Sequence, residues 1–203
     1  MNSPLQPDQL NSTFQQRTVV QNEAFQAVIN NERLANSLNI LVKIVKAELG
    51  SAVRTAFYLA YPDGKRLHAI DGAGDMSQTY TGALDGFPVG DDSFCSGYAI
   101  ATGHPHHTRD VFQDPHWQPY LELVSAHQFR ASSSYPIVDR QGKAVGSFAL
   151  YFPDVHEASA AEGALAEAVT QAAAVILSHH IQTQDRAHAE EALRQSEDKY
   201  RSL

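Results

Sequence analysis

Apolar residues recur at three- and four-residue steps in two stretches, one near each end of the chain. The first runs from Thr18 to Leu49 and the second begins after His156. This spacing places the apolar side chains on one face of a helix. It predicts an amphipathic helix, or two in succession, in the first stretch, ended by Gly50.

The second stretch predicts one very long helix. Ser159 and Glu162 have the spacing of a capping box, and the chain has no proline after His156 and no glycine after Gly163. A helix of about 45 residues is about 65 Å long, since each residue adds about 1.5 Å. A domain of this size cannot bury such a helix, so we expect its far end to pack on another copy of the chain or on a further domain.

Between these helices, the pattern predicts two hairpins and two short helices. Strand-like runs at 53–61 and 66–70 flank an Asp-Gly turn, and runs at 130–138 and 144–152 flank Gly142. One short helix is expected to start at a cap on Asp91 or Asp92 and to end at Gly103, and the other is opened by Asp114 before a proline and runs to about residue 127. A short strand is expected near 106–111, and a loop with one helical turn at 71–90.

Antiparallel hairpins interleaved with helices indicate the α+β class. We expect a central antiparallel β-sheet of five to six strands flanked by helices, with long N- and C-terminal helices. The chain divides into a disordered polar tail at 1–17, a domain at 18–178 and a projecting helix at 179–203.

Composition narrows the setting and the partners. The net charge is −8 and no run of Lys or Arg is present, which argues against nucleic acid as a partner. Cys95 is the only cysteine, so no intrachain disulfide can form and a reducing cytoplasm is the natural location. The longest aliphatic run, 172–177, is far shorter than the ~20 residues of a membrane helix, and the N-terminus lacks the features of a signal peptide. We therefore expect no membrane association.

Several motifs resemble those of GAF domains, the small-molecule sensor modules of bacterial signalling proteins. The resemblance covers about 34–177 and rests on Phe94-Cys95-Ser96-Gly97, Asp110-Val111, Asp114-Pro115-His116-Trp117, Phe129-Arg130-Ala131, Ser134-Tyr135-Pro136-Ile137 and Gly146-Ser147-Phe148-Ala149-Leu150-Tyr151. It implies a GAF-like sensor domain at 18–178 and a signalling helix at 179–203.

The C-terminal segment 189–203 resembles the linker that opens a PAS domain. That resemblance implies a longer protein, of the two-component or cyclic-di-GMP signalling type, whose output domain is a histidine kinase or a cyclic-di-GMP synthase or phosphodiesterase. Nothing in the sequence decides between them.

The polar and reactive residues have alternative interpretations. Cys95 lies in the first turn of a predicted helix, where a thiolate is favoured, but a buried free cysteine usually acts as a small apolar residue. Four histidines at 104, 106, 107 and 116 form a local cluster without metal-ligand spacing, so exposed loop histidines are the favoured interpretation and no metal site is predicted. Asp110 and Asp114 are expected to cap or to bond loops rather than to act as an acid–base pair.

Aromatic residues and a run of serines suggest a ligand pocket between the sheet and the two short helices. Strand alternation must send at least one hydroxyl of Ser132-Ser133-Ser134 toward those helices. No catalytic residues are predicted and no cofactor can be named. The candidate ligand-binding residues are Phe94, Cys95, Tyr98, His107, Asp110, Trp117, Tyr120, Ser132, Ser134 and Tyr151.

The long helices suggest a parallel homodimer in which the terminal helices of two copies form a coiled coil or bundle. A polar segment from His179 to Arg186 interrupts the apolar seam. The residues proposed for the dimer and signalling helix are Leu165, Ala172, Ile176, Leu193, Tyr200 and Leu203.

Three functions remain open. The first is a cytoplasmic sensor that binds an unidentified small molecule and signals through its C-terminal helix to an output domain in the same chain. The second is a redox enzyme or thiol sensor that uses Cys95, and the third is a dimerisation module without a ligand. The sensor is the preferred hypothesis, in which this chain itself is not an enzyme.

Overall fold

The computed structural model describes residues 18–201 except 20 and 31, and from residue 196 it describes the backbone alone. The predicted tail at 1–17 and Leu203 lie outside the described residues, as does the side chain of Tyr200.

The centre of the fold is a six-stranded antiparallel sheet with the strand order β3-β2-β1-β6-β5-β4. The two predicted hairpins form its middle, because β1 pairs with β2 and with β6, and β6 pairs with β5. The strands are β1 Arg54–Ala60, β2 Arg66–Gly74, β3 Phe87–Pro88, β4 His106–Thr108, β5 Ala131–Val138 and β6 Ala144–Phe152. The predicted α+β fold with a sheet of five to six strands is confirmed.

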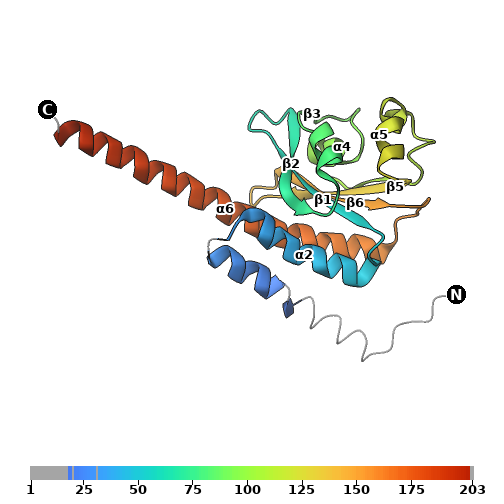
Figure 1. Ribbon diagram of the computed structural model, residues 1–203, viewed down its shortest axis with the longest axis horizontal. Helices are drawn as coiled ribbons and strands as arrows, with labels where there is room; N and C mark the ends of the chain where they lie inside the picture. The colour runs from blue at the N-terminus through green and yellow to red at the C-terminus, as the bar shows by residue number, and fades with distance from the viewer. Residues whose placement is uncertain (1–17, 20, 31, 202–203) are drawn as a thin grey trace.

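Helices cover both faces of this sheet. Figure 1 shows α2 and the first half of α6 side by side on one face, with α4 and α5 on the other. The first predicted stretch forms two helices in succession, at 21–29 and at α2, and Gly50 ends the second. The helices are α2 Leu34–Leu49, α3 Gln78–Ala83, α4 Cys95–Thr102, the 3-10 helix η1 Pro115–Tyr120, α5 Leu121–Ala126 and α6 Ala160–Arg201.

The start of α4 differs from the prediction. Phe94, not Asp91 or Asp92, is the N-cap residue, and no side chain caps this helix. Residues 91–93 instead form a turn, in which the Ser93 amide donates to the Gly90 carbonyl oxygen (3.1 Å). The predicted end is right, because Gly103 adopts the left-handed conformation that suits glycine (φ 70°).

The segment after α4 follows the prediction in outline. The strand expected at 106–111 ends at Thr108, since Asp110 starts a turn by accepting the Phe112 amide (3.1 Å). Asp114 caps the next helix as predicted, with its Oδ1 accepting the His116 amide (2.9 Å). The region 71–90, expected to be a loop with one helical turn, contains the short helix α3, but it also holds the end of β2 and the strand β3, which were not expected.

Strand alternation divides the core between the two faces. On the face covered by α2 and α6, Phe57 and Leu150 belong to a large aliphatic cluster with the apolar sides of both helices. On the opposite face, which we call the lid face, Tyr58 and Tyr151 belong to a cluster under α3, α4, η1 and α5. Adjacent residues of one strand thus pack into different hydrophobic clusters, one on each face of the sheet.

The last helix begins as predicted. The Ser159 amide donates to Glu162 Oε2 (2.7 Å), and the Glu162 amide donates to Ser159 Oγ (3.2 Å), which completes the capping box. The first half of α6 packs its apolar side on the domain through Leu165, Ala172 and Ile176, all buried. From residue 181 to 195 its side chains are exposed, apart from a half-buried one at 183.

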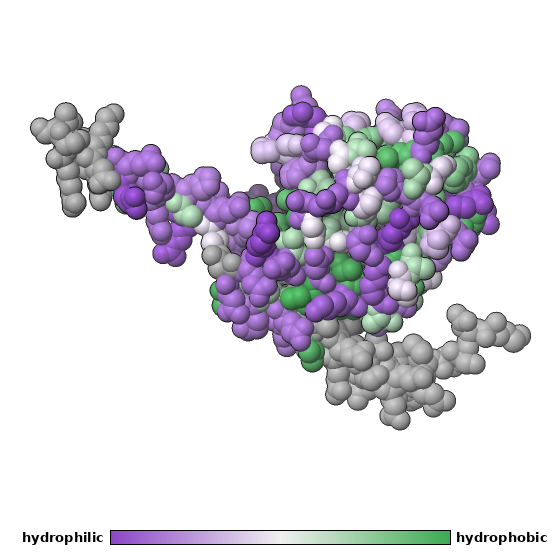
Figure 2. All heavy atoms as spheres, in the orientation of Figure 1, coloured by the Kyte–Doolittle hydropathy of each residue, from purple (hydrophilic) through white to green (hydrophobic). Residues whose placement is uncertain are grey.

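One helix in the described chain, Ala160–Gln195 within α6, is long and apolar enough to cross a membrane. Half of its apolar window is buried inside the protein, which is how the core helix of a folded domain appears. Figure 2 shows that the part of α6 projecting from the domain has a mostly hydrophilic surface.

Candidate functional site

The candidate site is the space between the lid face of the sheet and the helices above it. Aromatic rings fill this space. The Phe94 and Trp117 ring centroids are 4.0 Å apart, and the Tyr151 ring lies 5.0 Å from Phe129 and 5.3 Å from Tyr80. We refer to the six rings as the aromatic cluster, and each of these residues is at most 4% exposed: Tyr58, Tyr80, Phe94, Trp117, Phe129 and Tyr151.

Hydroxyl groups lie beside these rings. The Tyr58 and Tyr151 hydroxyl oxygens are 2.8 Å apart, and Ser96 Oγ on α4 lies 2.9 Å from Ser134 Oγ on β5. Trp117 Nε1 donates to Thr108 Oγ1 (3.3 Å). Three further buried hydroxyls on this side of the sheet make no well-formed hydrogen bond within the protein, namely those of Tyr80, Ser132 and Ser147. The Tyr80 hydroxyl interacts with that of Tyr151 and the Ser132 hydroxyl with the Cys95 thiol, so Ser147 alone among these three is without such an interaction.

Such hydroxyls are unusual in a closed interior, because burying a hydroxyl without a hydrogen bond costs about 1–3 kcal/mol. Ser132 is paired across the sheet with Tyr151, and Ser147 with Tyr58, so both serines lie on the lid face. The lid face therefore presents hydrogen-bonding capacity that the protein itself leaves unused.

Cys95 lies in this interior rather than at its entrance. It is 2% exposed, and its Sγ lies 3.7 Å from Thr108 Oγ1 and 3.8 Å from the Ser132 carbonyl oxygen. Burial raises the pKa of its thiol from 9.0 to about 11. The thiol is therefore neutral near pH 7, and the position at the start of α4 does not produce a thiolate. Burial likewise raises the pKa values of Tyr58, Tyr80 and Tyr151 well above 10.

The structure brings together seven of the ten candidate residues on the lid face. The hydroxyl expected to reach the helices is that of Ser134, and the ring of Tyr120 lies 5.0 Å from Phe94. The seven are Phe94, Cys95, Trp117, Tyr120, Ser132, Ser134 and Tyr151.

The other three lie outside the buried interior. Tyr98 belongs to α4 on the lid side, where its half-buried ring contacts the His106 ring, at 4.6 Å between centroids. His107 faces the opposite side of the sheet, because it alternates with Thr108 along β4. Asp110 is half-buried, and its Oδ2 accepts a hydrogen bond from Arg130 (2.6 Å).

Sequence reasoning missed three members of the aromatic cluster. Tyr58 is the sixth residue of the predicted strand at 53–61, on the opposite face from Phe57, and strand alternation alone leaves open which of the two faces the pocket. Tyr80 lies in a region expected to be a loop. Phe129 precedes β5 and was noted only as part of a family motif.

The histidine cluster disperses in the fold. His104 and His116 are exposed, as expected, whereas His106 and His107 are half-buried, and burial lowers the pKa of His106. His107 bonds within the protein, with its Nδ1 2.7 Å from Ser133 Oγ. Within the described part of the chain, no group of three or more His, Cys, Asp or Glu side chains could hold a metal ion.

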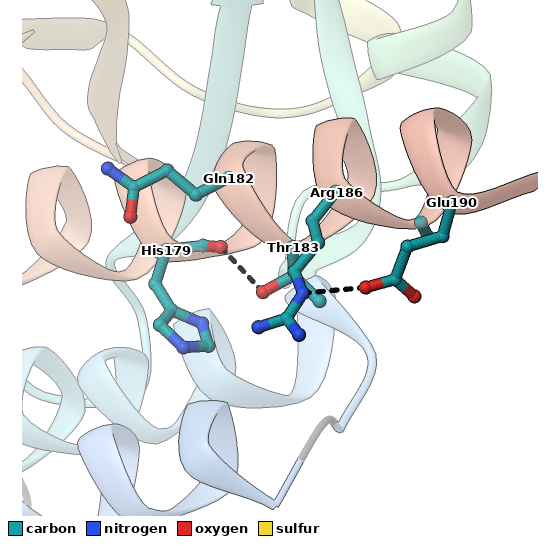
Figure 3. A pocket seen from close by; sticks show the side chains of 6 residues that line it. His179, Gln182, Thr183, Arg186 and Glu190 are labelled. Carbon is teal, nitrogen blue, oxygen red and sulfur yellow. Dashed lines mark hydrogen bonds and ion pairs between the residues drawn. The ribbon is translucent and has the colours of Figure 1, made fainter. Parts of the chain in front are cut away.

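One open surface hollow, of about 570 Å³, borders this interior at Phe129, and two others lie away from it. One of about 510 Å³ follows α6 along the polar segment, where Thr183 donates to the His179 carbonyl oxygen (2.9 Å) and Arg186 Nε donates to Glu190 (2.8 Å) (Figure 3). Another of about 330 Å³ lies between β5 and α6. Neither is lined by the aromatic cluster.

Comparison with curated proteins gave no match. Several solved structures are similar at low identity. A GAF domain of a phosphoenolpyruvate-protein phosphotransferase from Coxiella burnetii has 14% identity and a TM-score of 0.64, over 84% of this chain and 98% of that chain. A domain of a putative two-component sensor histidine kinase from Sinorhizobium meliloti has 18% identity and a TM-score of 0.55, over 79% of this chain and 96% of that chain. The reduced form of fRMsr from Staphylococcus aureus has 16% identity and a TM-score of 0.58, over 79% and 94%.

These structural likenesses show the same fold. The family itself is shown by the sequence, since the model of the GAF domain matches residues 33–177, which is more than half of the chain. The matched range runs from the start of α2 to the buried half of α6 and includes the whole sheet and all the lid helices. The chain therefore belongs to the GAF domain family, a family of sensory and signalling modules.

Proposed function

We propose that this GAF domain is a cytoplasmic sensor of a small molecule and that it signals through α6 to an output domain of a longer protein. The observation that carries the proposal is the course of α6. One continuous helix packs its first half on α2 and β5 and extends its second half away from the domain (Figure 1). A change in the domain that shifts the buried half must also move the exposed half.

The chemistry of the lid face indicates the ligand class. Among the described residues Glu162 is the only buried side chain that carries a charge, and it belongs to α6 on the other face. The lid face offers hydroxyls, a neutral thiol, aromatic rings and, at its edge, the carboxylate of Asp114, which accepts a hydrogen bond from Thr108 (3.1 Å). An anionic ligand buried there would lose its hydration and meet this carboxylate, and a cationic one would have only Asp114, already bonded to Thr108 and His116, as a partner, so either would cost several kcal/mol. We therefore propose an uncharged aromatic or heteroaromatic ligand that forms hydrogen bonds.

Such a ligand needs a more open arrangement of the lid helices than the closed one described here. It acts by binding the open state more tightly than the closed state, which shifts the population between them. The hydroxyls of Tyr80, Ser132 and Ser147, which make no well-formed hydrogen bond in the closed state, are the groups available to bond it.

A thermal-shift screen tests the sensor. Neutral aromatics and heteroaromatics, with cyclic nucleotides, amino acids and 2-oxo acids as charged comparisons, are added to the 203-residue chain. A ligand present at about 100 times its Kd should stabilise the protein by about 2.7 kcal/mol. A Ser132→Ala variant removes only the hydroxyl and should weaken the response, while His104→Ala, at an exposed site, should not. Stabilisation by charged compounds alone would contradict the proposed ligand class.

The second candidate function is a dimerisation module without a ligand, and the closed packing of the aromatic cluster favours it. In that case no compound in the screen stabilises the protein. A redox function of Cys95 is less well supported, since its thiol is buried and its pKa is raised to about 11. A Cys95→Ser variant that keeps the full ligand response would exclude the thiol from the mechanism.

Both candidates include a homodimer through the terminal helices. Leu193 is 62% exposed and Val175 is 47% exposed on α6, although both are apolar. In a Cys95→Ser background, a single cysteine at Leu193 should form a disulfide between two copies under mild oxidation. A cysteine at the exposed Lys143 serves as control. Equal cross-linking at the two positions would refute the helical dimer.

The segment 189–203 is proposed to lead into a PAS domain, followed by a histidine kinase or by a cyclic-di-GMP synthase or phosphodiesterase. The domain assignment follows the same proposal, with a tail at 1–17, the sensor at 18–178 and the signalling helix at 179–203. The polar segment around His179 and Arg186, seen in Figure 3, is the place where a change of register along a dimeric bundle costs least.

A further inference from the structure

The short edge strand β4 contacts both faces of the sheet with two adjacent residues. It pairs with β5 at only three positions, His106, His107 and Thr108. Since side chains alternate along a strand, Thr108 points to the lid face and His107 to the face that carries α6. Thr108 is 4% exposed, and His107 is half-buried.

Thr108 is held by three groups of the candidate site. Its Oγ1 accepts a hydrogen bond from Trp117 Nε1 (3.3 Å) and donates to Asp114 Oδ2 (3.1 Å). Cys95 Sγ lies 3.7 Å from the same oxygen. The hydroxyl thus connects the first residue of α4 with the aromatic cluster and with the N-cap of η1. Any rearrangement that opens this part of the lid must break or move these contacts.

His107 is tied in the same way to the segment that leads into α6. Its Nδ1 lies 2.7 Å from Ser133 Oγ, and its Nε2 lies 2.9 Å from the His156 carbonyl oxygen and 3.2 Å from the Ala158 amide nitrogen. Arg109, the first residue after β4, adds a backbone bond, because its carbonyl oxygen accepts a hydrogen bond from the His156 amide (3.1 Å). Since Nε2 either donates to the His156 carbonyl oxygen or accepts the Ala158 amide, one side-chain bond and one backbone bond fix residues 156–158 to the end of β4.

The first turn of α6 is fixed to that same segment. The His156 ring stacks on Phe152 at 3.8 Å between centroids, and its Nε2 lies 2.7 Å from Glu162 Oε1. The other oxygen of Glu162 accepts the Ser159 amide in the capping box. A continuous set of contacts runs from Trp117 through Thr108, His107 and His156 to the start of α6.

We propose that β4 couples the state of the lid-face interior to the position of the first turn of α6, with His107 as the positioning residue. This inference rests on the proposed sensor function and names the route of its signal. Three ladder positions at a sheet edge hold β4, so it moves at a lower cost than a central strand does. Because Thr108 and His107 share one peptide bond, neither can shift without the other.

The single cysteine of the chain provides a reporter on the lid face. Cys95 reacts with a thiol reagent such as 5,5′-dithiobis(2-nitrobenzoate) only when the lid opens, since it is buried. Amide hydrogen exchange at residues 162–166 reports on the first turn of α6. His107→Ala should raise the Cys95 labelling rate, although its side chain is on the opposite face, and Thr108→Val should raise exchange at 162–166. Coupling free energies between sites correspond to changes of about 5- to 150-fold, and we expect each change to lie in that range.

The control variant is His104→Ala. His104 is exposed two residues before β4 and bonds only locally, to Thr102. It should leave both rates unchanged. His107→Gln, which keeps a polar group at the site, should give a smaller effect than His107→Ala and serves if the alanine variant folds poorly.

The proposal is overturned if each substitution affects only its own face of the sheet. In that case His107→Ala changes only the amide exchange of α6, and Thr108→Val changes only the labelling rate of Cys95. The proposal is also overturned if the increase in the Cys95 labelling rate is no larger than the fold-change that corresponds to the measured loss of unfolding free energy. In that case global unfolding, and not opening of the lid, exposes the thiol. Neither readout needs a ligand, so an unsuccessful ligand screen refutes the sensor and leaves the coupling measurable. A successful screen without coupling across β4 leaves the sensor intact and refutes the route.

Discussion

Replacing Gly97 by alanine should destabilise the protein, although alanine is the better helix former. Gly97 is the third residue of α4, and Gly→Ala at an unobstructed helical position gains up to about 1 kcal/mol. Here a Cβ atom would overlap with Ser93 Oγ and with the Pro88 carbonyl oxygen, which are themselves joined by a hydrogen bond of 2.7 Å. The glycine allows α4 to lie directly on this loop.

The size of the effect follows from three contributions. Overpacking costs about 1–3 kcal/mol, and loss of the Ser93–Pro88 hydrogen bond adds about 0.5–1.5 kcal/mol. The helical preference of alanine offsets about 1 kcal/mol of this sum. We therefore expect Gly97→Ala to lower the free energy of unfolding by about 1–3 kcal/mol.

Gly163→Ala is the matched control. Gly163 is also helical, in the first turns of α6, but its Cβ position is open space. The same substitution there should stabilise by about 0.5–1 kcal/mol. Urea unfolding followed by circular dichroism measures both, with stability read from the midpoint at constant slope. The reasoning fails if Gly97→Ala is as stable as the wild type, or if the two variants change stability in the same direction.

Three further predictions concern the buried groups and the start of α6. Tyr151→Phe removes a hydroxyl that is 2.8 Å from that of Tyr58 and that also interacts with the Tyr80 hydroxyl, and it should cost about 1–2 kcal/mol. Tyr80→Phe removes a hydroxyl without a well-formed hydrogen bond and should cost less than Tyr151→Phe; equal losses in urea unfolding would contradict this. Burial raises the pKa of Cys95 from 9.0 to about 11, so the folded state holds the thiol proton more tightly than the unfolded state does. The stability that this proton contributes is present below pH 9 and should fall by about 2 kcal/mol between pH 8 and pH 10.5. Cys95→Ala should reduce that loss. Ser159→Ala removes the cap of α6 and should cost about 1 kcal/mol, seen as faster amide exchange in its first turn; unchanged exchange would show that the cap does not hold this end.

The fold was largely predictable because its signals are local. The Asp-Gly turn, the cap at Asp114 and the capping box of α6 each depend on residues within a few positions of one another, and each prediction is confirmed. The failure at Asp91 and Asp92 has a local cause as well. A turn closed by Ser93 takes up these residues, and the helix starts later without a side-chain cap.

The candidate site was less predictable because it depends on which face each strand residue takes. Ser134 and Tyr151 were placed on the lid face through motif and alternation, and they lie there. His107 was assigned to the same side, but it is one residue from Thr108 and so faces α6. Tyr80 comes from a segment without a periodic pattern, and only the tertiary packing of α3 on β2 brings it into the aromatic cluster.

The projecting half of α6 also acts as a lever arm. From residue 181 to residue 201 the helix is about 31 Å long, at about 1.5 Å per residue. A tilt of only about 10° at the edge of the domain would therefore displace its far end by about 5 Å, which is close to one helical turn. Rearrangements too small to change the packing density of the core can thus become large at the end of the helix, where a following domain would be attached.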